Sequence, residues 1–178
     1  MNVGLFALRV VVGALFIGHG TQKLFGWFGG HGIEGTGGFM EQLGYRPGKS
    51  FAVLGGVAEA GGGALFVLGF LTPFAALAVI AMMINAVFAV HIDNGLWIQD
   101  NGYEYPLVVA VAAGALALAG GGSLSVDHIL GLNLGGFIGA LAILLGVIAG
   151  GISAGIRQPE PAEPAAEGER EAHVRKAA

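Results

Sequence analysis

The chain has 178 residues, of which 54% are hydrophobic and only 11% are charged, and its mean hydropathy is +0.74. A soluble domain carries about one-quarter charged residues, so this composition indicates an integral membrane protein. The net charge of −4 does not favour a nucleic-acid partner. Because the chain has no cysteine, disulfides, thiolate nucleophiles and Cys-ligated zinc or iron–sulfur centres are excluded, and no metal site is predicted.

Five apolar segments predict the fold. They cover residues 3–24, 51–71, 73–91, 105–124 and 134–156. A helix needs about 20 residues to cross a hydrocarbon core of about 30 Å, and the fourth segment reaches this length only with its terminal glycines. Backbone amides in lipid must be paired within the segment, and the alternation typical of a barrel is absent, so we expect an all-α membrane bundle.

The bundle divides along the chain as follows. Residues 1–132 are expected to form a four-helix core with an interfacial loop, rich in glycine and aromatic residues, over 25–50. Residues 133–156 form an additional transmembrane helix, and 157–178 a disordered charged tail. The first segment is expected to be retained, because no cationic region precedes it and no small-x-small cleavage site follows it.

Basic residues predict the orientation of the five spans. The loops 24–50 and 92–104 and the tail fall on one side of the membrane, and that side holds seven of the 8 Lys and Arg residues. Only Arg9 is nearer the other side. By the positive-inside rule the tail and both loops are cytoplasmic and the N-terminus is outside.

A polar cluster ends the first segment. His19, Gln22 and Lys23 share one helix face through their i, i+3 and i+4 spacing. Anchoring at the membrane interface suffices to explain Lys23 and Trp27. It explains His19 and Gln22 less well, because they lie about a turn deeper.

Glu59 is the one charged residue of the second segment and lies roughly 12 Å from its cytoplasmic start. An unpaired carboxylate is costly there, so Glu59 should face the bundle, where His19 or Arg9 could reach it. Two interpretations remain open: a structural Glu–Arg or Glu–His bridge, and an acid that handles protons or faces a quinone. Gly55 and Gly62 share its face and would let a neighbouring helix approach closely.

Other polar residues gather at the same level: Asn85, His91, Asp93, Tyr103, Glu104 and Tyr105. His91 is either an interfacial residue or, with His19, one of two axial haem ligands, although nothing else in the sequence indicates a haem. The stretch GHGIEG, residues 30–35, matches G-x-G-x-x-G. It follows a membrane helix and not a strand, so we reject it as a dinucleotide fingerprint.

The last apolar segment carries a glycine stripe. Gly135, Gly139, Gly146 and Gly150 fall within about 60° of one another on a helix. The stripe reflects the general abundance of glycine, or packing against the protein's own core, or packing against a second copy. We favour a homodimer, because the segment is appended to a core of four helices that could already be complete.

Three stretches resemble the DoxX family. They are GHGTQKLFGWFGG at the end of the first segment, GGVAEAGGGALFVLGFLTPFAAL across the second and third, and NGYEYPL before the fourth. The resemblance covers roughly residues 3–130 and implies a small protein of the bacterial inner (plasma) membrane. Some relatives are assigned as the membrane subunit of thiosulfate:quinone oxidoreductase, and others are associated with a sulfurtransferase and superoxide dismutase. The motif positions that match are His19, Lys23, Glu59 and Glu104.

Two functions compete. One is a membrane subunit of a redox complex that couples a soluble oxidoreductase or sulfurtransferase to the quinone pool. Glu59 and His19 would then handle protons or face the quinone, and the cofactor would be contacted by His19, Gln22, Lys23, His91 and Glu104. The alternative is a non-catalytic scaffold for cytoplasmic redox partners, a sulfurtransferase or superoxide dismutase of the oxidative-stress response. Transport is a third hypothesis, and the sequence alone identifies neither substrate nor cofactor.

Overall fold

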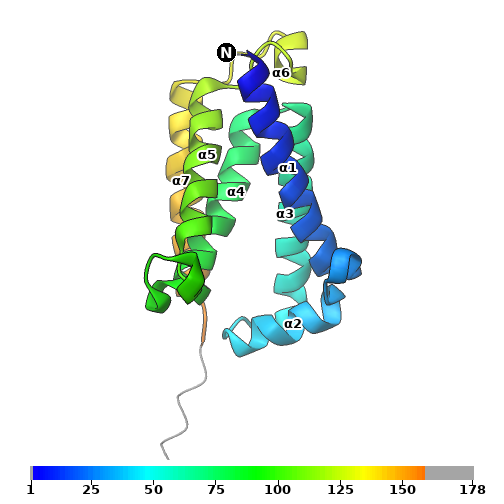
Figure 1. Cartoon of the computed structure of the whole chain (residues 1–178), viewed down its shortest axis with the longest axis vertical. Helices are drawn as coiled ribbons and strands as arrows, with labels where there is room; N and C mark the ends of the chain where they lie inside the picture. The colour runs from blue at the N-terminus through cyan, green and yellow to red at the C-terminus, as the bar shows by residue number, and fades with distance from the viewer. Residues whose placement is uncertain (1, 159–178) are drawn as a thin grey trace, which may run out of the picture.

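The computed structural model describes residues 2–158, and within them every regular element is helical. The long helices are α1 (Asn2–Phe25), α3 (Gly48–Leu68), α4 (Thr72–Ala86), α5 (Glu104–Ala119) and α7 (Phe137–Gly155). They run up and down beside one another, as Figure 1 shows. The shorter α2 (Gly32–Gln42) lies across one end of the bundle and α6 (Val126–Ile129) lies at the other. We call these the α2 end and the α6 end. The predicted all-α fold is confirmed.

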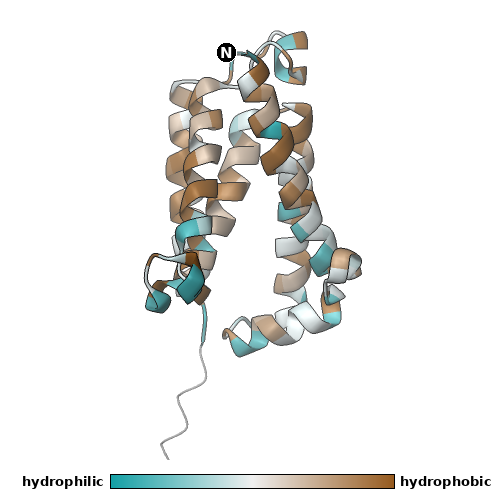
Figure 2. Cartoon of the chain, in the orientation of Figure 1, coloured by the Kyte–Doolittle hydropathy of each residue, from teal (hydrophilic) through white to brown (hydrophobic). Residues whose placement is uncertain are grey.

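Four helical stretches are long and apolar enough to cross a membrane: Asn2–Phe25, Gly48–Leu68, Thr72–Asn94 and Phe137–Gly155. The chain is therefore a multi-pass membrane protein. Figure 2 shows the apolar colouring along these helices and hydrophilic residues gathered at the α2 end. α5 is apolar but has only 16 residues, because the chain turns at Gly120 and Gly122, which both have positive φ. The fourth segment was therefore expected to be longer than it is.

Glycines allow α1 and α3 to pack backbone against backbone. A Cβ atom added to Gly13 would lie 2.5 Å from the carbonyl oxygen of Gly63, and one added to Gly20 would lie 2.6 Å from that of Gly56. Such distances exclude any larger residue without a shift of the helices. This close approach brings the side chains at the end of α1 within reach of the middle of α3.

A second small-residue face of α3 points to α4. A Cβ atom at Gly62 would lie 3.3 Å from the Cβ of Ala78, and one at Gly55 would lie 3.6 Å from the methyl carbon of Met82. The prediction that this face receives a neighbouring helix is confirmed. Glu59 is buried on the same helix between these two glycines.

The glycine stripe packs against the same chain, with Gly135 just before α7 and the other three glycines within it. A Cβ atom at Gly135 or Gly139 would clash with carbonyl oxygens of α5, at 2.9 Å from Leu118 and 2.1 Å from Ala117. Gly146 and Gly150 approach α4 in the same way, with the carbonyl oxygens of Leu77 and Ala81 at 3.0 and 2.6 Å. α4 and α5 already occupy the groove that the glycines form, which favours the alternative of packing against the protein's own core, and the homodimer stays a prediction.

The buried apolar core lies between α1, α3, α4 and α5 and includes Val12, Phe16, Phe66, Val79 and Leu116. Along α1 these residues fall between Arg9 and Lys23, the two cationic residues of that helix. The core therefore separates a polar cluster at the α6 end from a second cluster at the α2 end.

Candidate functional site

A cavity of about 420 Å³ lies inside the bundle at the α2 end. Its walls come from the end of α1, the middle of α3 and the second half of α4, and α2 with its flanking loops lines it at the end of the bundle. The apolar lining consists of Phe39, Met40, Leu43, Met82, Met83, Ala86, Ala89 and Val90. The polar lining consists of Gln22, Lys23, His31, Thr36, Tyr45, Glu59 and Asn85. A pocket of this size that combines apolar surface with converging polar groups is typical of a small-molecule site.

The central polar feature is an ion pair between Lys23 and Glu59. The Lys23 Nζ atom donates to Glu59 Oε1 across 2.5 Å, and the two side chains are 23% and 5% exposed. Glu59 Oε2 is buried without a hydrogen-bond partner among the described residues. Lys23 thus points into the bundle and is more than an interfacial anchor. Neither predicted partner of Glu59, His19 or Arg9, forms this bridge.

A second polar pair joins the opposite walls of the cavity. The hydroxyl of Tyr45, in the loop between α2 and α3, donates to Asn85 Oδ1 on α4 across 2.5 Å. The Tyr45 side chain is buried and its ring packs against Phe51, with ring centroids 5.0 Å apart. Asn85 was expected at this level, whereas Tyr45 was missed. Tyrosines near membrane interfaces are too common for its position alone to indicate a buried role.

The end of α4 changes its hydrogen-bond pattern beside the cavity. Val87–His91 forms a π-helix, a form that often marks functional sites, and Ala89 lines the cavity. Arg157, just after α7, donates from Nη1 to the Ala89 carbonyl oxygen and from Nη2 to that of Phe88, at 3.1 and 2.9 Å. The next residue, Gln158, donates its backbone N–H to Gly44 across 2.9 Å. The end of α7 therefore links two walls of the cavity.

His19 lies outside the cavity. Its ring Nδ1 is 3.2 Å from Gln22 Oε1, and the residue is exposed in a shallow groove shared with Leu15 and Phe28. Gln22 lines both this groove and the cavity, and its amide nitrogen donates to the Phe28 carbonyl oxygen across 3.2 Å. The structure therefore brings Gln22, Lys23 and Glu59 together and places His19 on the outer surface.

His91 and Glu104 organise the loop between α4 and α5. The His91 Nδ1 atom is 2.7 Å from the Asn101 carbonyl oxygen, and Glu104 Oε2 accepts the backbone N–H of Ile98 across 3.0 Å. Neither residue lines the cavity. His19 and His91 are engaged with different partners on different parts of the surface, which does not favour the haem interpretation.

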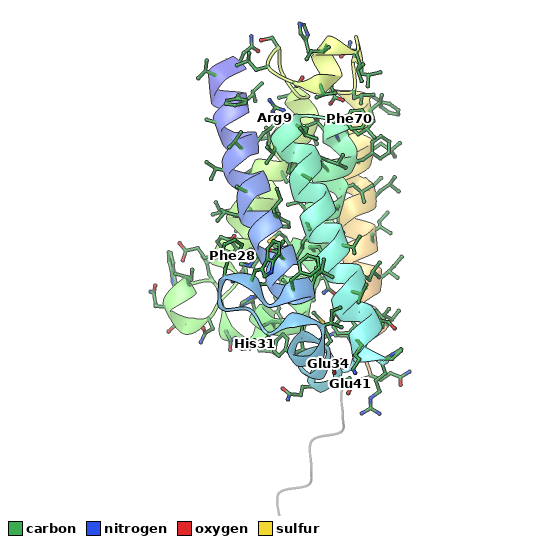
Figure 3. The ribbon with its side chains drawn as sticks, turned by 90° about the vertical axis from the view of Figure 1, so that its right-hand side faces the viewer. Arg9, Phe28, His31, Glu34, Glu41 and Phe70 are labelled. Carbon is green, nitrogen blue, oxygen red and sulfur yellow. The ribbon has the colours of Figure 1, made fainter. Side chains whose placement is uncertain are left out.

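Arg9 belongs to the opposite end of the bundle. It is fully buried, and its guanidinium donates to the carbonyl oxygens of Phe66 and Leu124. Figure 3 shows Arg9 near one end of the molecule, with His31, Glu34 and Glu41 at the other. Arg9 therefore fastens the loop before α6 to α1 and α3 and takes no part in the cavity.

Asp127, beside Arg9, holds the start of α4. Its carboxylate accepts the backbone N–H groups of Leu71 and Thr72 at 2.7 and 3.0 Å, and the Thr72 hydroxyl at 2.7 Å. Thr72 does not cap this helix with its own side chain: its hydroxyl donates to Asp127, and that distant carboxylate supplies the cap. Asp127 was missed, although it is the one acidic residue predicted on the same side of the membrane as Arg9.

The helices and the cavity define a multi-pass helical membrane protein with an internal polar–apolar site. The DoxX family model matches residues 4–92, half of the chain, and every residue named in the cavity lining lies within that range. The chain therefore belongs to the DoxX family. It is similar to an uncharacterized protein of Haemophilus influenzae, 36% identical over 66 residues. That match spans 37% of this chain and 44% of the relative, less than half of the relative's length. No solved structure matches the chain.

Proposed function

We propose that this protein is the membrane subunit of a redox assembly in the bacterial plasma membrane and that it binds a quinone in the cavity at the α2 end. The observation that carries the proposal is the buried Lys23–Glu59 pair in the wall of a cavity that also offers apolar side chains to a ligand. Ion pairs inside a membrane domain are costly and usually serve a function. Membership of the DoxX family supports a membrane subunit without naming its partner.

The lining fits the chemistry of a quinone head group, a flat apolar ring with two oxygen atoms. Phe39, Met82 and Met83 offer aromatic and thioether surface to a ring, and thioethers contact aromatic rings favourably. The Asn85 amide nitrogen can donate to a ring oxygen, and Glu59 can accept from a ring hydroxyl of the reduced form. A bound quinone would supply a couple of two electrons and two protons, which the cysteine-free chain cannot provide itself.

The residues of the chain would position the ring and handle protons. Lys23 and Glu59 form a pair without net charge, and the second carboxylate oxygen of Glu59 can accept a hydrogen bond from a ligand hydroxyl. The apolar core, with Val12, Phe16 and Phe66, lies between the cavity and the α6 end. Protons would therefore pass only between the cavity and the solution at the α2 end, and the proposal includes no proton path across the membrane.

The α2 end is proposed to face the cytoplasm. Lys23, Arg46, Lys49 and Arg157 lie at this end, and Arg9 is the one Lys or Arg of the described residues at the other. A soluble oxidoreductase, sulfurtransferase or superoxide dismutase would then dock on the cytoplasmic side, close to the cavity. The charged tail, predicted to be disordered, lies outside the described residues apart from its first two.

The test is quinone binding by the purified protein in lipid nanodiscs. Quinone should co-purify with the protein. After its removal, a short-chain quinone that is titrated into the nanodiscs should bind. Met83→Trp, which fills the cavity, should abolish binding. The matched control is Leu144→Trp, on an exposed position of α7, which should leave binding unchanged. If the protein captures a soluble redox enzyme but neither contains nor binds quinone, the scaffold function replaces this proposal.

A further inference from the structure

We propose that the cavity selects the reduced, hydroxyl-bearing form of its ligand, a hydroquinone, over the oxidised quinone, and that Glu59 makes the selection. This inference rests on the proposed function and adds to it the redox form of the ligand and the residue that distinguishes the two forms. The structural feature that supports the inference is one oxygen atom, Glu59 Oε2.

The two carboxylate oxygens of Glu59 differ in their surroundings. Oε1 accepts from Lys23 Nζ, whereas Oε2 is buried and has no partner among the described residues. A buried acceptor without a donor costs about 1–3 kcal/mol, and more when it is charged. The carboxylate paired with an ammonium group can only accept, so its natural complement is a ligand that donates.

The neighbouring side chains leave this role to a ligand. The hydroxyl proton of Tyr45 is directed to Asn85 Oδ1, and the amide nitrogen of Gln22 donates to the Phe28 carbonyl oxygen. Glu59 lines the cavity, so a molecule bound there lies beside its carboxylate, and we infer that a donor on that molecule pairs with the free oxygen.

Hydroquinone and quinone differ in the property that this oxygen would detect. A hydroquinone carries two O–H donors, so it can donate to Glu59 Oε2. A quinone carries two carbonyl oxygens, which only accept, and a carbonyl placed against a carboxylate is repelled. A hydrogen bond to a charged group is worth about tenfold to hundredfold in affinity. Preference for the reduced form would raise the midpoint potential of the bound two-electron couple by about 30 mV for each tenfold.

Three probes of the same ring separate hydrogen-bond donation from shape. They are a short-chain hydroquinone held reduced under anaerobic conditions, the corresponding quinone, and the dimethyl ether of the hydroquinone. Wild-type protein in nanodiscs should bind the hydroquinone about tenfold to hundredfold more tightly than either of the others. This comparison needs no variant, so it does not depend on the folding of a mutant.

The Glu59→Gln variant identifies the residue responsible. An amide can donate as well as accept, so the ratio of hydroquinone to quinone affinity should fall to about one or invert. The control is Glu34→Gln, which makes the same change on a side chain 80% exposed at the same end of the bundle and should keep the wild-type ratio.

Each outcome decides between the two proposals. If wild-type protein binds the hydroquinone and its dimethyl ether equally, Oε2 is satisfied by water. The inference is then wrong, while quinone binding stands. A wild-type ratio that persists in Glu59→Gln would also overturn it. Failure of all three probes to bind would contradict the proposed function itself.

Discussion

The Lys23 Nζ atom in the last turn of α1 and the Glu59 Oε1 atom in α3 lie 2.5 Å apart in the wall of the cavity. The two residues are 36 positions apart in the sequence, and they meet because glycines let α1 and α3 pack closely. The pair connects the architecture of the bundle to its chemistry. It contributes to stability only as long as both charges are present.

Removal of one charge should therefore cost more than removal of both. Lys23→Met leaves a buried carboxylate without its cation and should lower the free energy of unfolding by about 3 kcal/mol. The double variant Lys23→Met/Glu59→Leu should recover most of that loss. The measurement is denaturant unfolding in detergent followed by circular dichroism.

An exposed ion pair supplies the control for this experiment. Lys49 and Glu34 are 62% and 80% exposed, so Lys49→Met should cost less than about 1 kcal/mol. A double variant at Lys23 and Glu59 that is no more stable than Lys23→Met would show that the cost comes from lost packing and not from an unpaired charge.

The carboxylate that caps α4 gives a second prediction. Asp127→Ala removes the acceptor of three hydrogen bonds at the start of α4 and should lower stability by about 2–3 kcal/mol, with Asp127→Asn losing less. Asp100→Ala, in an exposed loop, should change stability by less than about 0.5 kcal/mol. Asp127→Ala and Asp100→Ala should both retain quinone affinity once folded, because neither residue lines the cavity. If folded Asp127→Ala lost quinone binding, the contacts at the α6 end would affect the cavity at the α2 end.

Hydropathy predicted the helices well because lipid leaves the backbone few choices. Apolar segments of sufficient length become helices, and glycine or proline sets their ends, as Gly69 does in its left-handed conformation after α3. It could not show that Gly120–Gly122 turn away from α5, because glycine is compatible with helix and turn alike within lipid.

The polar contacts were harder to predict than the helices. Depth along the helix left His19 and Arg9 as partners for Glu59, but the contact depends on how α1 is rotated against α3 and on the reach of a long side chain. Lys23 satisfies both conditions. The role of Asp127 depends on contacts 55 and 56 residues away in the sequence. The one signal in the sequence was that Arg9 and Asp127 are the one basic and the one acidic residue predicted on that side of the membrane.

The glycine stripe of α7 gives a third prediction. Gly139→Leu places a side chain where a Cβ would already lie 2.1 Å from the Ala117 carbonyl oxygen, so it should unfold the monomer or displace α7. Gly151→Leu, on the same helix, has nothing within 4 Å of its Cβ position and should be tolerated. Mass measurement and unfolding in detergent compare the two. A folded Gly139→Leu monomer obtained from a wild-type dimer would support the intermolecular interpretation.

Orientation can be tested with single cysteines, since the chain has none of its own. In intact cells a membrane-impermeant maleimide should label Leu130→Cys at the α6 end and leave Lys49→Cys at the α2 end unlabelled until the cells are opened. The physical reason is the positive-inside rule, which places the basic α2 end in the cytoplasm. Labelling of Lys49→Cys in intact cells would reverse the proposed docking side.

The link between α7 and the cavity walls gives the last prediction. Arg157 donates to the carbonyl oxygens of Phe88 and Ala89 in the π-helix, where the altered hydrogen-bond pattern leaves these acceptors available. Arg157→Ala should loosen this wall and raise the labelling rate of a cysteine at Ala86, a cavity position, severalfold. Arg157→Lys should give an intermediate rate, because an ammonium group cannot reproduce the planar fork that serves both oxygens. A cysteine at Val147, on the exposed surface of α7, provides the reference rate. Equal acceleration at both positions would mean that Arg157 stabilises α7 as a whole and does not control access to the cavity.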